Sequence, residues 1–231
     1  MTLGVLGGTF DPIHLGHITA GLRAQAALRL DRVMLVPSRV PPHRTTSAGA
    51  SPEARLAMAG LAAAEHPGWT ASDLELMREG PSYTFDTLAA LAKPRLGDAG
   101  IFFIIGADAF AEIATWSRYP AVLDLAHFAV VARPGITLDS LRKRLPDLAE
   151  RMTTPDLYQP PTSAEATAGK QAANRTPDEN TRVILIETTT PDVSSTDIRH
   201  RVAFGQSIAG LVPDVVASYI AQHRLYVEAT V

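Results

Sequence analysis

The fold of this chain is decided by Gly7-Gly8-Thr9-Phe10-Asp11-Pro12-Ile13-His14-Leu15-Gly16-His17, a stretch that joins a short apolar run to a helical pattern. The run from Leu3 to Leu6 is predicted to be a buried strand, and Ile18 to Leu30 a helix with apolar residues four apart on one face. The two adjacent glycines carry no Cβ, so a phosphate or a sugar can approach the backbone closely. A helix that begins near Leu15 also offers free N–H groups and the positive end of its dipole to an anion.

His14 and His17 lie one helical turn apart and are predicted to point at the same place. Three roles are open to them: zinc ligation, covalent catalysis on a transferred group, and donation to polyphosphate oxygens in a transfer transition state. Zinc ligands on a helix are usually four residues apart around a glutamate, and the chain has no cysteine to complete a site. The glycine-rich turn between strand and helix favours the third role.

These residues carry a resemblance to a known superfamily. Gly8 to His17 resembles the signature of the nucleotidyltransferases that share a His-x-Gly-His motif, which include adenylyl- and cytidylyltransferases and, more distantly, class I aminoacyl-tRNA synthetases. The form found here is most similar to the bacterial nicotinate-nucleotide adenylyltransferases, with the pantetheine-phosphate adenylyltransferases as near relatives. The resemblance implies that His14 and His17 are catalytic and that ATP is bound by residues of the turn, namely Gly8, Thr9 and Phe10.

Composition narrows the class of protein. The 231 residues are 46% hydrophobic and 19% charged, as in an ordinary globular domain. A net charge of −3 argues against a general nucleic-acid binder, although it leaves room for small anionic substrates. The absence of cysteine excludes disulfides and thiol chemistry. No apolar run approaches the ~18 residues of a membrane span, so we expect a cytoplasmic protein without membrane contact.

Apolar runs alternate with helical patterns along the chain, which predicts one Rossmann-like α/β domain over residues 1–231. We expect a doubly wound parallel sheet with helices on both faces and ligands beyond the carboxyl ends of the strands. The further predicted strands are 33–36, 71–77 (an edge or half-buried strand), 101–105, 128–132 and 183–186, and the further predicted helices are 51–66, 82–93, 108–116, 120–126, 195–204 and 213–223. The proline-rich polar segment 153–181 is predicted to be a mobile insertion.

Two segments are candidates for binding a second nucleotide. Pro41-Pro42-His43-Arg44 offers two phosphate donors on a stiff loop, although a solvated basic loop explains it equally well. The family carries Pro-Pro-His-Lys/Arg at this place, which implies that His43 and Arg44 contact the mononucleotide. The segment 81–88 resembles the family's Ser-Tyr-Thr…Asp-Thr-Leu segment, which implies that Thr84, at a helix start, helps to position the nicotinate carboxylate.

Another candidate site follows the apolar strand 101–105. Gly106 permits close approach of a nucleoside, and Asp108 either accepts hydrogen bonds from a ribose or caps the next helix. Trp116 is predicted at the rim of the cleft, where its face suits a pyridinium ring, although a packed core is the commoner fate of tryptophan. The family's Gly-x-Asp…Trp pattern covers this stretch and implies ring stacking by Trp116. Gly106 and Asp108 are candidates for ATP binding, and the main chain of Ser117 is a candidate donor to the mononucleotide. Pantetheine-phosphate adenylyltransferases lack this segment and the 81–88 segment.

The last motif is Val193-Ser194-Ser195-Thr196-Asp197-Ile198-Arg199, in which hydroxyl residues open a helix and an arginine follows within one turn. Free N–H groups, hydroxyls and a guanidinium make a second phosphate site, although a plain helix cap with a solvated arginine is the alternative. The family's Ile-Ser-Ser-Thr-x-Ile-Arg implies that Ser195 and Thr196 bind ATP and that Arg199 is catalytic. Val131 to Gly135 matches a further family segment, to whose Arg133 we assign no role.

The five motifs occur in the family's order, and the resemblance covers Leu3 to Val227 except about Asp147 to Arg182. It implies an ATP:nicotinate-nucleotide adenylyltransferase of NAD biosynthesis whose partners are ATP and nicotinate mononucleotide, with Mg²⁺ bound through ATP rather than by dedicated protein ligands. Main-chain N–H groups of Thr84 and Ser117 suit the nicotinate carboxylate, and no acidic side chain occurs in 81–84 or 115–119 to repel it. We therefore expect kcat/KM to be at least ~10²-fold higher for nicotinate than for nicotinamide mononucleotide. Another adenylyl- or cytidylyltransferase and a non-catalytic nucleotide sensor remain alternatives, and the sequence leaves the oligomeric state open.

Overall fold

The computed structural model describes residues 1–40, 49–92, 100–132, 136–158 and 181–227. Within these ranges seven strands form one sheet in the order β3-β2-β1-β4-β5-β7-β6, and every neighbouring pair is parallel. The strands are β1 (Leu3–Gly8), β2 (Arg32–Pro37), β3 (Trp69–Ala71), β4 (Ile101–Gly106), β5 (His127–Ala132), β6 (Met152–Thr153) and β7 (Val183–Glu187). The helices are α1 (Leu15–Leu28), α2 (Pro52–Ala64), α3 (Thr84–Leu91), α4 (Ala107–Phe110), α5 (Leu138–Arg144), α7 (Ser195–Ala203) and α8 (Asp214–Gln222), with short 3₁₀ turns η1 (Ile113–Thr115), η2 (Ala121–Asp124) and η3 (Pro146–Arg151).

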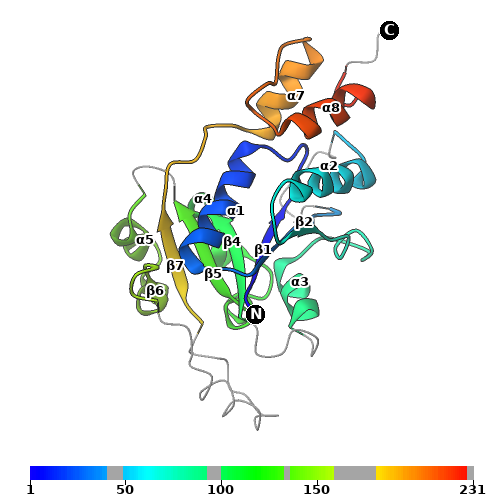
Figure 1. The fold of residues 1–231 in the computed structure, drawn as a ribbon. Coiled ribbons are helices and arrows are strands. Elements are labelled where there is room, and N and C mark those ends of the chain that lie inside the picture. The colour runs from blue at the N-terminus through cyan, green and yellow to red at the C-terminus, as the bar shows by residue number, and fades with distance from the viewer. Residues whose placement is uncertain (41–48, 93–99, 133–135, 159–180, 228–231) are drawn as a thin grey trace.

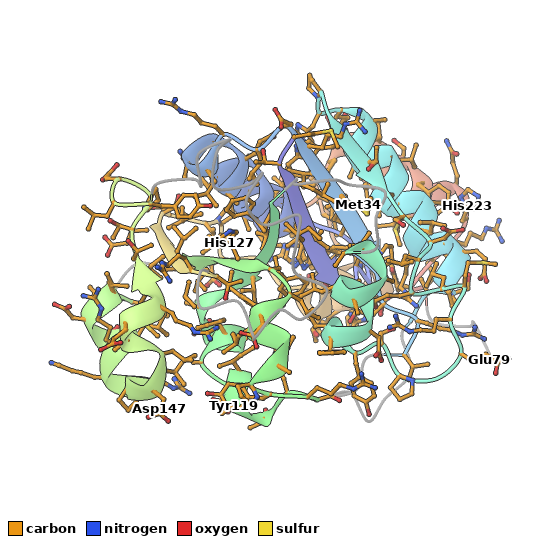
Figure 2. All side chains as sticks on the ribbon, turned by 90° about the horizontal axis from the view of Figure 1, so that it is seen from below. Met34, Glu79, Tyr119, His127, Asp147 and His223 are labelled. Atoms are coloured by element: carbon orange, nitrogen blue, oxygen red, sulfur yellow. The ribbon has the colours of Figure 1, made fainter. Side chains whose placement is uncertain are left out.

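Helices cover both faces of this sheet, because alternate residues of each buried strand point to opposite sides. Phe102 and Ile104 of β4 pack with α1, α2, α7 and α8, whereas Phe103 and Ile105 pack with α3, α4 and α5. Seen along the strands, the segments that carry Tyr119 and Asp147 lie on one side of the sheet and α1 and α2 on the other (Figure 2). The α/β fold with a doubly wound parallel sheet is confirmed.

Several element boundaries differ from the sequence prediction. The predicted strand 71–77 is wrong beyond its first residue, because β3 ends at Ala71 and a turn follows, in which the Leu74 N–H donates to the Ser72 hydroxyl at 3.3 Å. Such side-chain bonds offer the backbone an alternative to the sheet. The predicted helix 108–116 is divided into α4 and η1, and 120–126 is the short turn η2. The sequence analysis did not identify α5, η3 or β6.

Both ends of the segment 153–181, which is predicted to be an insertion, contact the rest of the domain. Its first residues still belong to the fold: Tyr158 packs edge-on against Phe102 at 5.8 Å, and its hydroxyl lies 3.4 Å from His127 Nε2. At the other end, Arg151 Nη1 donates to the Thr181 hydroxyl at 3.1 Å. Residues 159–180 lie outside the described residues, so their mobility stays a prediction. In the described part of the chain, no helix is long and apolar enough to cross a membrane.

Candidate active site

The strand order reverses between β1 and β4, so a crevice opens beyond the carboxyl ends of these two strands. A cavity of about 590 Å³ lies there, within the usual range for small-molecule sites. Gly7 and Gly8 end β1 and Gly106 ends β4, and all three line the cavity. A Cβ added at Gly106 would meet nothing within 4 Å, so the absence of a side chain there leaves open space for a ligand.

The turn between β1 and α1 is held from behind by Arg55 of α2, a residue that the sequence analysis did not identify. Arg55 is only 1% exposed, and its Nη1 donates to the carbonyls of Thr9 at 2.8 Å and Ser38 at 2.6 Å. A buried guanidinium that binds backbone carbonyls fixes the path of both loops. The sequence did hold a sign of this burial, because the spacing of Arg55, Met58 and Ala62 places the arginine on the apolar face of the helix.

His14 and His17 lie together at the start of α1, with their rings stacked at 3.7 Å between centroids. The His14 backbone N–H donates to His17 Nδ1 at 3.3 Å. A neutral His17 that accepts at Nδ1 carries its proton on Nε2. Burial, followed by the neighbouring His14, lowers the pKa of His17 well below its ordinary value. His17 therefore offers an uncharged N–H donor, and both histidines line the cavity.

The beginning of α7 meets the same turn. The Ser194 hydroxyl caps the helix by accepting from the Asp197 N–H at 3.1 Å, and the Ser195 hydroxyl donates to the Pro12 carbonyl at 2.9 Å. Ser195 and Thr196 both line the cavity. The positive end of the α7 dipole thus faces a space that is also bordered by the histidine pair, an arrangement suited to a polyphosphate.

Arg199 lies at the edge of this group and does not line the cavity. Its Nη1 donates to the Asp11 carbonyl at 2.8 Å and lies 3.5 Å from Asp11 Oδ2, and its Nη2 donates to the Thr196 hydroxyl at 3.3 Å. The guanidinium therefore links Asp11 to a residue of the cavity wall. Phe10 does not line the cavity either: it is 1% exposed and packs edge-on behind the His17 ring at 5.1 Å. Any contact of Phe10 with ATP would have to come from its backbone.

A second set of predicted residues lines the cavity from α3 and from the segment after β4. Trp116 is partly buried and packs nearly perpendicular to the Phe103 ring, with 6.1 Å between the ring centroids, so it is both packed and in the cavity wall. Thr84 is the first residue of α3, and Ser117 follows Trp116. Asp108 is not the cap of α4, because Gly106 holds that position, and the aspartate is an exposed residue of the wall.

Glu75 is an acidic residue of the wall that the sequence analysis missed. It is 6% exposed, and the Thr87 hydroxyl donates to its Oε1 at 2.5 Å. Burial raises the pKa of the Glu75 carboxyl, against the opposing effects of the Thr87 and Ser82 hydroxyls and Arg78. The absence of acids from 81–84 and 115–119 therefore does not describe the whole wall. Nothing in the sequence pointed to Glu75 in the wall, because the pattern of 71–77 predicts a strand, whereas the segment is a turn that reaches α3.

Eleven of the predicted site residues line the one cavity, namely Gly8, Thr9, His14, His17, Thr84, Gly106, Asp108, Trp116, Ser117, Ser195 and Thr196. His43, Arg44 and Arg133 lie outside the described residues. Among the residues that the structure describes, no group of three or more His, Cys, Asp or Glu side chains could hold a metal ion.

Comparison with known proteins shows which family the chain resembles over nearly its full length. Residues 5–201 match the family described as cytidylyltransferase-like. The chain is 42% identical over 234 aligned positions to the "Probable nicotinate-nucleotide adenylyltransferase" of Desulfatibacillum aliphaticivorans, covering 98% of this chain and 100% of that protein. It is also 42% identical over 224 positions to the protein of the same name from Roseiflexus sp. (strain RS-1), covering 97% of each.

Among solved structures, the fold is similar to that of Plasmodium falciparum nicotinic acid mononucleotide adenylyltransferase complexed with NaAD. The TM-score is 0.69 at 16% identity, with 97% of each chain covered. At that identity the likeness concerns the fold alone, whereas the bacterial relatives establish the family. The chain belongs to the cytidylyltransferase-like family and, within it, to the nicotinate-nucleotide adenylyltransferases.

Proposed function

We propose that this chain transfers the adenylyl group of ATP to nicotinate mononucleotide, which yields nicotinate adenine dinucleotide and pyrophosphate in NAD biosynthesis. The main support is that one cavity is lined both by His14, His17 and the start of α7 and by Trp116 and the start of α3. The first set suits a polyphosphate and the second a flat ring, so the cavity has features for two nucleotides. Relatives of 42% identity carry the name of this activity.

ATP would occupy the part of the cavity beside the histidines. Its phosphates would meet the N–H donors of α1 and α7 together with Thr196, and its nucleoside would lie by Gly8, Gly106 and Asp108. Thr9 and Ser195 would contribute through the turn and the helix start, and Arg199, which does not line the cavity, would act on the phosphates from its position beside Thr196. The family relationship supports these roles, because the relatives are named adenylyltransferases and ATP is the donor of an adenylyl group.

Nicotinate mononucleotide would occupy the part beside Trp116. Its pyridinium ring suits the face of the tryptophan, and main-chain N–H groups of Thr84 and Ser117 suit its carboxylate. His43 and Arg44 are the proposed phosphate contacts on the strength of the sequence alone. Glu75 in the same wall would repel the carboxylate when ionised, and its raised pKa reduces that effect.

In the reaction, a 5′-phosphate oxygen of the mononucleotide attacks the α-phosphorus of ATP in line. A new bond forms between that oxygen and the α-phosphorus while the bond to the bridging oxygen breaks, and pyrophosphate leaves with its electron pair. The attacking phosphate is already anionic, so no general base is required. Catalysis is positioning together with charge stabilisation, to which the neutral His17 contributes an N–H donor.

Mg²⁺ fits this site as a partner of ATP. The ion is usually held by substrate phosphates and water with one or two carboxylates. Asp108 is an exposed carboxylate of the cavity wall, so it is the kind of protein group that could bind the ion directly or through water. When bound, Mg²⁺ would neutralise charge on the phosphates.

The proposal is tested by offering the purified protein each of the four ribonucleoside triphosphates with nicotinate mononucleotide, nicotinamide mononucleotide or phosphopantetheine. Formation of dinucleotide and pyrophosphate from ATP and nicotinate mononucleotide is the expected result. A different best pair would support another transferase of the family, and binding of ATP without pyrophosphate release for any acceptor would support a nucleotide sensor. A cytoplasmic location and a homo-oligomer stay predictions.

A further inference from the structure

Tyr226, which follows α8, contacts the turn between β1 and α1 through one buried carboxylate, that of Asp11. Asp11 is 1% exposed and accepts from the Gly49 N–H at 2.7 Å, the Ala50 N–H at 2.9 Å and the Tyr226 hydroxyl at 2.9 Å. Arg199 lies 3.5 Å from its Oδ2 and donates to its backbone carbonyl at 2.8 Å. A buried charge needs such partners, and here they come from three separate parts of the chain, namely 49–50, Arg199 and Tyr226.

These parts converge at the end of the molecule toward which β1 runs, where α7 and α8 lie (Figure 1). Tyr226 follows α8 and adopts a φ of 63°, in the left-handed region that is costly for a tyrosine. Its ring packs against Gly49: a Cβ added there would lie 3.1 Å from both the ring of Tyr226 and Cδ of Arg199. Gly49 thus allows tyrosine and arginine to approach each other.

We propose that Tyr226 is a positioning residue for the ATP site, which acts by holding Asp11 so that Asp11 holds Arg199 beside Thr196. Asp11 uses its carbonyl and one carboxylate oxygen on Nη1 of Arg199, and Thr196 in the cavity wall accepts from Nη2. A guanidinium has five N–H donors, so these contacts leave donors for a phosphate. Burial and the adjacent Asp11 raise the pKa of Tyr226, which keeps the phenol protonated and able to donate.

The inference rests on the proposed function, and the test separates the two. Y226F removes the hydroxyl and keeps the ring that packs on Gly49. We expect kcat/KM for MgATP to fall about ten-fold, as for a lost hydrogen bond to a charged group, with kcat/KM for nicotinate mononucleotide at saturating MgATP changed by less than about two-fold. The matched control is Y219F, since Tyr219 lies on α8 and stacks on His223 at 3.9 Å; it should behave as wild type.

A double-mutant cycle distinguishes positioning from general stabilisation. If Tyr226 acts through Arg199, Y226F in an R199A background should change kcat/KM for MgATP by less than about two-fold. G49A, which would displace the Tyr226–Arg199 pair without removing a polar group, should give the same selective loss as Y226F. The inference is overturned if Y226F matches wild type, if its loss persists in the R199A background, or if both substrates are affected equally. A wild-type chain that makes no dinucleotide would instead refute the proposed function.

Discussion

Replacing His17 by alanine removes one donor from the transition state and little from the binding of ATP. The imidazole is fixed on two sides, since Nδ1 accepts from the His14 N–H at 3.3 Å and the ring stacks on His14 at 3.7 Å. Phe10 packs edge-on against it from behind at 5.1 Å. A ring held in this way loses little freedom when its Nε2–H meets a phosphate oxygen, which is the condition for effective electrostatic stabilisation.

The size of the effect follows from this geometry. Removal of one preorganised donor costs about 10²–10³ in kcat, or about 2.7–4 kcal/mol. We expect the lower end of that range for H17A, because His14 remains in the wall with its ring in contact with the vacated space. ATP in its ground state is also held by the start of α7, so its KM should change by less than about three-fold.

The assay is initial-rate kinetics of pyrophosphate release with each substrate varied in turn, for wild type, H17A and the control H223A. His223 follows α8 at the periphery of the molecule (Figure 2), so its replacement should leave kcat and both KM values unchanged. A rise in KM for ATP at unchanged kcat would refute the reasoning, because it would show that His17 only anchors ground-state ATP.

The remaining predictions concern the ring site, the substrate, the insertion and pH. Trp116→Ala should lower kcat/KM for nicotinate mononucleotide by about ten-fold or more through lost stacking, while Trp116→Phe retains most of it. Nicotinate mononucleotide should exceed the nicotinamide form in kcat/KM by at least about 10²-fold; comparable values would refute a carboxylate site. Deleting 159–180 should leave the melting temperature and turnover near wild type, whereas a deletion that also removes Tyr158 and Thr181 should lower the melting temperature, since both contact the domain. Because the pKa of His17 is lowered in the folded state, the unfolded chain binds more protons below about pH 6.5, so the free energy of unfolding should fall as the pH falls through that value.

The pH prediction has a direct control in the same variant. Urea unfolding of wild type and H17A is compared between about pH 7.5 and 5, where one such group contributes a slope of at most about 1.4 kcal/mol per pH unit. H17A should show a smaller loss of stability on acidification than wild type. Parallel curves for the two proteins would contradict the assignment of this dependence to His17.

The parts of the fold that the sequence predicted are those fixed by local pattern. The apolar run 101–105 ending at a glycine is β4, and a turn joins β1 to α1 as expected, although it spans 9–14 because Gly7 and Gly8 belong to β1. The predicted strand 71–77 was wrong because alternating polar and apolar residues fit a turn as well as a strand. In the turn, the Ser72 hydroxyl accepts from the Leu74 N–H. That error also concealed Glu75. The extent of the domain over 1–231 stays a prediction.

The contacts that the sequence could not predict join residues far apart along the chain. Asp11 is 188 positions from Arg199 and 215 from Tyr226, and no local pattern relates these residues. Arg55 supports Thr9 across 46 positions, although an arginine on an apolar helix face was a usable signal. Motifs therefore located the chemical groups of the site, whereas the network that holds them depends on packing between α2, α7 and the carboxyl terminus.

The adenylyl-transfer reaction is tested most directly by following both ends of ATP in one experiment. The protein is incubated with nicotinate mononucleotide and with MgATP that carries different phosphorus isotopes at its α and γ positions, and the products are separated. Attack at the α-phosphorus predicts the α label in nicotinate adenine dinucleotide and the γ label in pyrophosphate, in equal amounts. Appearance of the γ label in the nicotinate product, or release of inorganic phosphate in place of pyrophosphate, would contradict it.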